Sequence, residues 1–186
     1  IAHKNRSFSG TLERATYVFA DGKPIAIACK LLHHKKQQRI SGMDFTPRIL
    51  EKANENNLSV FIYGSTDEVI SSARQKIISS YPNVYFAGAI SPPFRQLTEV
   101  EIKKDIEKIN LSGAHLILVA LGCPKQEKWM AEHRGKVNAV MLGVGAAFDF
   151  HAGVKAQPPA WMQKMGLEWL FRLITEPRRL WKRYLY

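Results

Sequence analysis

The chain has 186 residues and a mass of 21.1 kDa, with 46% hydrophobic and 23% charged residues. That is the size and composition of an ordinary globular domain, and it excludes a disordered chain, a collagen-like repeat and a coiled coil. The 27 Lys and Arg residues outnumber the 16 Asp and Glu residues and leave a formal net charge of +11, which predicts an anionic partner: nucleic acid, an acidic membrane surface or a phosphorylated substrate.

The excess charge lies at the two ends of the chain. Residues 1–52 carry +6, residues 53–160 carry +1 and residues 161–186 carry +4. Two cysteines, Cys29 and Cys123, are too few for a disulfide framework and indicate a reducing compartment. No apolar run approaches the ~20 residues that span a bilayer, so any membrane contact is expected to be peripheral.

A parallel α/β sheet is predicted from the order of apolar runs and helical patterns. Residues 16–19 are the first candidate strand, and helices are expected to begin at Thr46, at Ser65 or Thr66, and at Thr98. Further buried strands are predicted at residues 58–63, 84–88, 115–121 and 139–143. The expected fold is a Rossmann-like parallel sheet with flanking helices, in an α/β domain of residues 1–157.

Small residues follow three of these strands, at Gly64, Gly122 and Gly143. Ligands of open α/β sheets bind outside the carboxyl ends of the strands, where glycine allows close approach, so the turns indicate a nucleotide or phosphosugar crevice. Glycine after a strand is also ordinary turn chemistry. The dinucleotide-binding fingerprint and the phosphate-loop motif are both missing from the sequence.

After residue 157 the composition becomes aromatic and basic, with Trp161, Trp169 and Trp181 close together. A helix beginning at Pro177 would carry an apolar aromatic face opposite a Lys- and Arg-rich face. Residues 158–186 are therefore predicted to form a basic amphipathic helical appendage. The apolar face suits the headgroup boundary of an anionic membrane, and it suits docking onto the domain or onto a second subunit equally well.

Three acidic or amide side chains are candidates for chemistry. Asp21, beside Gly22, is either a turn residue or a general base presented to a cleft. Gln126, at the start of a predicted helix, either faces a bound anion or caps the helix. Asp149, between aromatic residues, needs a hydrogen-bond partner such as a ribose hydroxyl or a backbone N–H. No metal-ligand spacing accompanies them, so basic side chains and helix dipoles would have to hold any phosphate.

Six segments in order along the chain resemble the TagA/WecG/CpsF family of bacterial glycosyltransferases. They are residues 20–22 (ADG), 39–44 (RISGMD), 61–64 (FIYG), 121–127 (LGCPKQE), 143–149 (GVGAAFD), and 166–173 (GLEWLFRL) continuing to 176–185 (EPRRLWKRYL). The resemblance implies an inverting transfer of a sugar, N-acetylmannosamine-type or a related hexose, from a UDP-sugar to a polyprenyl-diphosphate-linked sugar. It places this reaction at the cytoplasmic membrane face, in cell-surface polysaccharide or teichoic acid synthesis, without a metal or other cofactor.

The same resemblance assigns roles to individual residues. It implies that Asp21 is the general base, that Arg39 steadies the diphosphate and that Gln126 lines the same cleft. Asp149 falls where the family contacts the nucleoside. The glycines Gly22, Gly64, Gly122 and Gly143 are candidate substrate-binding positions at the turns.

In the appendage, the resemblance implies that Arg172 and Arg179 bind the lipid diphosphate while the appendage reaches the membrane. Relatives usually begin with a further strand and helix, so one wall of the cleft is expected to lie before Ile1. Two alternatives to a transferase stay open: a basic nucleic-acid-binding module, which would lack the usual RNA-binding signatures, and a catalytically idle membrane scaffold of the same fold. A transferase would need no nucleic acid as a partner.

Overall fold

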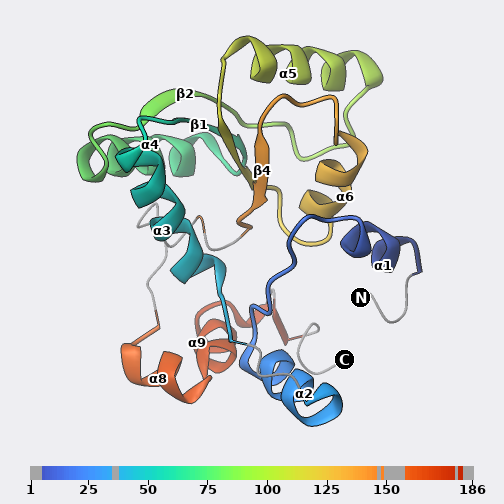
Figure 1. Cartoon of the computed structure of the whole chain (residues 1–186), viewed down its shortest axis with the longest axis vertical. Coiled ribbons are helices and arrows are strands. Elements are labelled where there is room, and N and C mark those ends of the chain that lie inside the picture. The colour runs from blue at the N-terminus through green and yellow to red at the C-terminus, as the bar shows by residue number, and fades with distance from the viewer. Residues whose placement is uncertain (1–5, 35–37, 146–147, 149–157, 179, 182–186) are drawn as a thin grey trace. The chain divides into compact units, whose positions relative to one another are not determined.

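The computed structural model of the chain describes residues 6–34, 38–145, 148, 158–178 and 180–181 (Figure 1). The chain forms two compact units, and each is described by itself below. Unit 1 consists of Ile1–Phe19 and Ile40–Lys155, and unit 2 consists of Ala20–Arg39 and Ala156–Tyr186.

Unit 1 is built on a four-stranded parallel sheet in the order β2-β1-β3-β4. Its strands are β1 (Ser59–Gly64), β2 (Tyr85–Ile90), β3 (Leu116–Ala120) and β4 (Val140–Gly143). Every residue of the central strand β1 is buried, as expected for a strand covered on both faces. The predicted α/β fold is therefore confirmed.

Two clusters of buried side chains lie on opposite faces of this sheet, because successive strand residues point to alternate sides. The first joins Ile62 and Leu118 to α3 (Gly42–Glu55) and α4 (Asp67–Ser80). The second joins Phe61, Tyr63 and Val119 of the strands to α5 (Glu99–Leu111) and α6 (Lys125–Glu132). Unit 1 is thus a three-layer sandwich with helices on both faces (Figure 1).

The helix starts follow local capping chemistry. Thr66 and Thr98 cap α4 and α5 as predicted, and Glu101 completes a capping box at α5. The predicted start at Thr46 is wrong, because Ser41 caps α3 and its hydroxyl accepts a hydrogen bond from the Asp44 N–H. Thr46 lies inside that helix and donates its hydroxyl to the Gly42 carbonyl.

The predicted strand at residues 16–19 is also wrong. These residues follow α1 (Arg6–Glu13) without regular structure, and Tyr17 and Val18 are exposed. Phe19 packs on Phe45 with ring centroids 4.7 Å apart. A β-branched and aromatic run forms a strand only where a neighbouring strand pairs with it, and none does so among the described residues.

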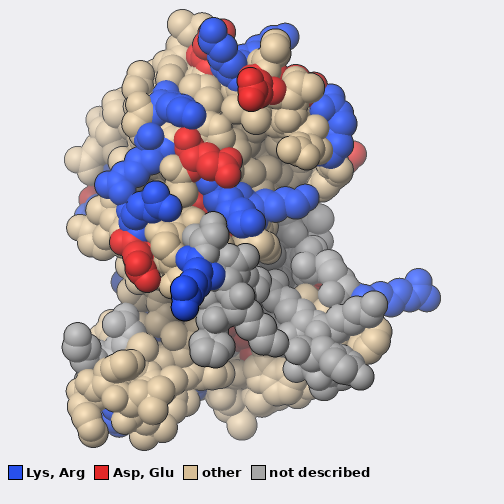
Figure 2. All heavy atoms as spheres, turned by 90° about the vertical axis from the view of Figure 1, so that its right-hand side faces the viewer, with Lys and Arg blue, Asp and Glu red and all other residues tan. Residues whose placement is uncertain are grey.

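Basic and acidic side chains are interspersed on the face of unit 1 seen in Figure 2. This mixture agrees with the near-neutral charge of residues 53–160. On this face the two kinds of charge are mixed and do not form a patch of a single sign.

Unit 2 contains α2 (Lys23–His33), α8 (Ala160–Met165) and α9 (Glu168–Thr175). Residues 20–39 thus group with the C-terminal residues, through contacts between segments that are far apart in sequence. The division into domains of residues 1–157 and 158–186 stays a prediction. Within the described part of the chain, no helix has both the length and the apolar character that crossing a membrane requires.

Candidate functional site

Because the strands of unit 1 are parallel neighbours, their carboxyl ends meet at one edge of the sheet. β1 ends there at Gly64, whose φ of +110° is a conformation that favours glycine. A Cβ added to Gly64 would lie 2.7 Å from the carbonyl carbon of Ala120 in β3. Close packing of two strand ends therefore explains this glycine, and its role in substrate binding stays a prediction.

Gln126 lies at the start of α6 and turns toward the end of β4. Its side chain is buried, with 7% of the residue exposed, and its Nε2 donates a hydrogen bond of 2.9 Å to Glu127 Oε1. A Cβ on Gly143 would come within 3.0 Å of Gln126 Nε2, and a Cβ on Gly145 within 3.1 Å of its Oε1. The two glycines make room for the glutamine, which gives Gly143 a packing role.

Two buried acceptor atoms at this edge have no hydrogen-bond partner among the described residues. They are Gln126 Oε1 and Glu127 Oε2. Since a carboxylate oxygen only accepts hydrogen bonds, Glu127 orients the Gln126 amide with its N–H toward itself and its carbonyl away. Unpartnered buried acceptors are costly, and hydroxyl groups of a bound ligand are suitable donors to both.

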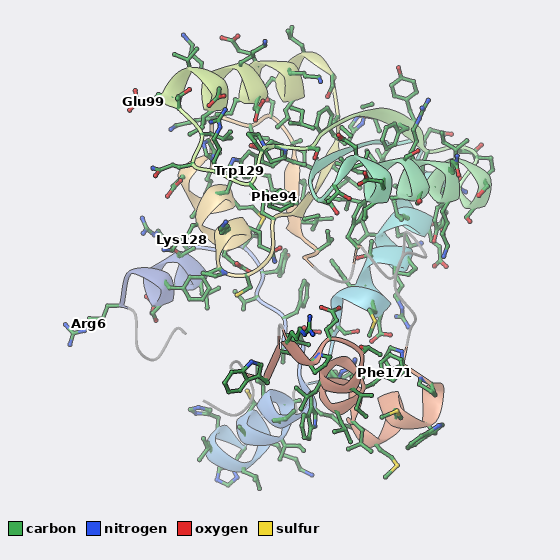
Figure 3. The ribbon with its side chains drawn as sticks, turned by 180° about the vertical axis from the view of Figure 1, so that it is seen from behind. Arg6, Phe94, Glu99, Lys128, Trp129 and Phe171 are labelled. Atoms are coloured by element: carbon green, nitrogen blue, oxygen red, sulfur yellow. The ribbon has the colours of Figure 1, made fainter. Side chains whose placement is uncertain are left out.

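A pocket of about 180 Å³ opens at the ends of β1, β2 and β3, and its lining includes Lys125, the residue before Gln126. Phe94 and Trp129 line it and approach it from the loop after β2 and from α6 (Figure 3). The Trp129 Nε1 donor is buried and has no partner in the described part of the chain. The pocket thus offers aromatic walls and one unpaired N–H, a combination that suits a planar polar ring.

The buried tyrosine of this pocket is uncharged, and cationic side chains lie at the exposed rim. The Tyr63 hydroxyl donates to Asp105 Oδ2 at 3.0 Å, and burial together with that carboxylate raises the pKa of Tyr63, so the phenol stays neutral. Lys125 and Arg95 also line the pocket, and both are exposed. Arg95 is paired with Glu101 at 2.6 Å, so an anionic group at the pocket mouth would meet the positive charge of Lys125.

The turn at Gly122 has a φ of +78°, and a Cβ there would meet no atom within 4 Å. Its glycine is required by the backbone conformation and not by packing. The space in front of it is open, which leaves its predicted contact with substrate compatible with the geometry.

A larger hollow of about 640 Å³ lies at the opposite edge, where the strands begin. Some polar groups beside it are paired with one another: the Ser59 N–H donates to His115 Nδ1 at 3.1 Å, and Ser59 Oγ donates to the Gly113 carbonyl at 2.9 Å. No Lys, Arg, Asp or Glu lines it. The smaller pocket therefore has the chemistry of a site, and the larger hollow does not.

Unit 2 holds a second group of the predicted site residues. Asp21 is exposed in the turn before α2, and Gly22 caps that helix. Arg39 Nε donates to the backbone carbonyl of Asp21 at 3.1 Å, and Arg39 Nη2 pairs with Glu168 Oε1 at 2.5 Å. The Arg39 and Glu168 side chains are mostly buried. Arg39 thus fastens the turn that carries Asp21 to the start of α9.

Sequence reasoning missed Glu168 as a functional residue. The available signal was an acid in a segment that is otherwise apolar and basic, GLEWLFRL. The partner of this acid lies 129 residues earlier in the chain, and spacing along a sequence does not show such a pair. Glu127 was missed for a different reason, because exposed glutamates are common in first helical turns.

The structure thus brings Asp21 and Arg39 together in unit 2, and Gln126 and Gly143 together in unit 1. Convergence of the two groups on one diphosphate stays a prediction. Asp149 and Arg179 lie outside the described residues, as does the side chain of Arg172. In the described ranges, no cluster of three or more His, Cys, Asp and Glu side chains could hold a metal ion.

A sequence model of the Glycosyl transferase WecG/TagA/CpsF family matches residues 1–186, the whole chain. The chain belongs to this family. It is a glycosyltransferase, and the resemblance seen in the six sequence segments is confirmed.

Two relatives of this glycosyltransferase bear the name N-acetylglucosaminyldiphosphoundecaprenol N-acetyl-beta-D-mannosaminyltransferase. The one from Bacillus subtilis (strain 168) is 35% identical over 185 residues, which cover 99% of this chain and 70% of the relative. The one from Staphylococcus aureus (strain NCTC 8325 / PS 47) is 30% identical over 180 residues, covering 96% of this chain and 69% of the relative. By their names, both relatives transfer N-acetylmannosamine to a sugar carried on undecaprenyl diphosphate.

Proposed function

We propose that this glycosyltransferase moves an N-acetylmannosamine-type sugar, or a related hexose, from a UDP-sugar to a polyprenyl-diphosphate-linked sugar. The reaction would serve cell-surface polysaccharide or teichoic acid synthesis at the cytoplasmic face of the bacterial membrane. The names of the two relatives support the acceptor and the sugar type. The observation that carries the proposal is the pair of buried acceptors on Gln126 and Glu127 at the carboxyl edge of the sheet, which have no hydrogen-bond partner among the described residues.

In unit 1 the proposed donor lies along that edge. Its base occupies the pocket lined by Phe94 and Trp129, where the Trp129 Nε1 donor meets a ring carbonyl. Its diphosphate lies near Lys125, which supplies positive charge without a metal. Its sugar hydroxyls donate to Gln126 Oε1 and Glu127 Oε2.

The proposed chemistry is a single displacement. Asp21 accepts the proton of the acceptor hydroxyl while that oxygen attacks the anomeric carbon of the donor sugar. The bond between this carbon and the UDP oxygen breaks on the opposite face, its electron pair leaves with UDP, and the anomeric configuration inverts. Arg39 holds the Asp21 turn through the backbone carbonyl, and this contact supports a positioning role for Arg39.

The test is sugar transfer from a panel of UDP-sugars to a prenyl-diphosphate-linked N-acetylglucosamine, with and without a chelator. Transfer from UDP-N-acetylmannosamine that persists in the chelator is the expected result. A Gln126→Ala variant should raise KM for the donor, while the exposed Gln75→Ala in α4 serves as the matched control. Transfer that requires an added metal, or a Gln126→Ala variant with unchanged donor KM, would contradict the proposed donor site.

A further inference from the structure

The helix α2 of unit 2 has no buried residue along its 11 positions. It begins directly after the Asp21–Gly22 turn, so whatever it contacts lies next to the proposed base. In a folded protein, an 11-residue helix is stabilised mainly by packing of its apolar face rather than by intrinsic propensity. The apolar face of α2 is therefore expected to contact a surface outside unit 2.

The apolar side chains of α2 form one broad exposed face. At ~100° per residue, Ile25, Leu32, Leu31 and Ile27 fall in one arc of the helix. Their exposed fractions are 56%, 75%, 69% and 53%, in that order. Four large aliphatic side chains in one arc of a single helix form a contiguous apolar patch, which scattered single residues do not.

The opposite arc of the same helix is basic. It carries Lys23, Lys30 and His33, and the sequence continues with His34 and two further lysines. No acidic residue occurs in the helix. Broad apolar and basic faces on one helix are the pattern of helices that lie in the headgroup region of an anionic bilayer.

Other helices of unit 2 add exposed apolar side chains of the kind found at membrane interfaces. Trp161 and Met165 of α8 and Trp169 and Ile174 of α9 are all exposed. α2 begins beside the turn between those two helices, since a Cβ on Gly166 would lie 2.6 Å from Lys23 Cδ. Tryptophan is enriched at the membrane–water boundary, where its ring is partly apolar and its N–H is solvated.

We propose that α2 is a membrane-contacting helix whose face of Ile25, Ile27, Leu31 and Leu32 enters the headgroup region of an anionic bilayer. Lys23 of the basic arc packs on the turn between α8 and α9, whereas the exposed Lys30 and His33 then lie at the level of the lipid phosphates, and Asp21 lies close to the plane that holds a prenyl diphosphate. This last point rests on the proposed function, whereas the membrane contact itself rests on the exposure and charge of α2.

A second copy of the chain fits this face less well. A stable dimer buries ~800 Å² on each partner and involves about 20 or more residues a side, whereas α2 exposes four large apolar side chains and α8 and α9 add four more. Lysine is also depleted in subunit interfaces, and it borders this patch. A bilayer needs only apolar insertion together with positive charge, and α2 supplies both.

The test is flotation of the full chain with vesicles containing about 30% phosphatidylglycerol, compared with phosphatidylcholine vesicles. The double variant Leu31→Gln/Leu32→Gln is expected to bind the anionic vesicles about tenfold more weakly. The matched control is Ile78→Gln/Leu111→Gln, which removes two aliphatic side chains of unit 1 that are 47% and 88% exposed, and it should bind as the unaltered chain does. Circular dichroism checks that both variants remain folded.

Three results would overturn the inference: unchanged vesicle binding by the α2 variant, an equal loss in the control, or sedimentation showing that the α2 variant only turns a dimer into a monomer. Sugar transfer is no part of this readout. If no acceptor received sugar while vesicle binding still depended on Leu31 and Leu32, the proposed function would fail and the membrane contact would stand.

Discussion

The sheet of unit 1 and the helix α2 of unit 2 treat apolar side chains in opposite ways. Unit 1 buries them in two clusters across its sheet, and Ile62 and Leu118 have no exposed surface. Unit 2 exposes Leu31 and Leu32 on a helix without a buried residue. Burial of apolar area is the main stabilising contribution to folding, so unit 1 carries its own stability, whereas the exposed face of unit 2 is suited to binding.

The largest effect is expected from Asp21→Asn in unit 2. Loss of the general base should lower kcat by about 10²–10⁴-fold with little change in stability, because the side chain is exposed. Steady-state kinetics and thermal unfolding of the same preparation measure both effects. Turnover at the level of the unaltered enzyme would show that Asp21 is a turn residue only.

Shortening a leucine in the core of unit 1 should lower the free energy of unfolding much more than shortening an exposed leucine in unit 2. Leu118→Ala in unit 1 is expected to lower the free energy of unfolding by about 2–5 kcal/mol, because it leaves a cavity in a fully buried site. Leu32→Ala in unit 2 should change it by less than about 0.5 kcal/mol. Urea unfolding followed by circular dichroism gives both values, and a comparable loss in the two variants would contradict the contrast.

Alanine substitutions at two glycines distinguish a turn that needs glycine for close packing from a turn that needs it only for its backbone conformation. Gly64→Ala should cost about 2 kcal/mol or more, because its Cβ would meet the Ala120 backbone at 2.7 Å and its φ is +110°. Gly122→Ala faces open space at a φ of +78° and should cost only about 1 kcal/mol of backbone strain. Equal losses in thermal unfolding would mean that the packing at Gly64 contributes nothing.

Breaking the ion pair within unit 2 should lower the free energy of unfolding less than shortening a core side chain of unit 1 does. Glu168→Gln removes the countercharge of the mostly buried Arg39 and is expected to lower stability by about 1–2 kcal/mol and kcat/KM several-fold. Glu168→Asp should partly restore kcat/KM, which a purely structural loss would not predict. The exposed pair Lys52–Glu55 of unit 1 is the control, and Glu55→Gln should change stability by less than about 0.5 kcal/mol.

The smallest effect is a pH dependence on the surface of unit 1. Hydrogen bonds from Arg95 and the Thr98 backbone lower the pKa of Glu101 from 4.5 to about 2. A depressed pKa means that the stabilising contribution of Glu101 is complete above pH 4.5 and is lost as the pH falls toward 2. Glu101→Gln should therefore flatten the change in urea midpoint over this pH range, and an unchanged profile would assign the acid sensitivity to other carboxylates.

The fold of unit 1 was largely predictable, because its signals are local. The buried run of β1 and the capping box of Thr98 and Glu101 are both visible within a few residues. The failures at residues 16–19 and Thr46 arose where local propensity competes with neighbours. Strand formation needs a pairing partner, and Ser41 offers an earlier cap than Thr46 does.

The candidate site was predictable in its residues and not in its contacts. Gln126 stands out as a polar residue after a strand-end glycine, yet its orientation depends on Glu127, Gly143 and Gly145. Asp21 and Arg39 were found through their motifs. The backbone hydrogen bond that joins them, and the pairing of Arg39 with Glu168, depend on tertiary structure that no sequence spacing reveals.

The space that Gly143 and Gly145 leave for Gln126 restricts how this enzyme can vary. A Cβ on Gly143 would lie 2.9 Å from Met130 Cε and 3.0 Å from Gln126 Nε2, and one on Gly145 would lie 3.1 Å from Gln126 Oε1, so even alanine, the smallest possible replacement, requires these side chains to shift. Neither glycine need touch substrate for its loss to impair the enzyme. Random mutagenesis should therefore recover impaired variants at both glycines, although a glycine has no functional group to lose.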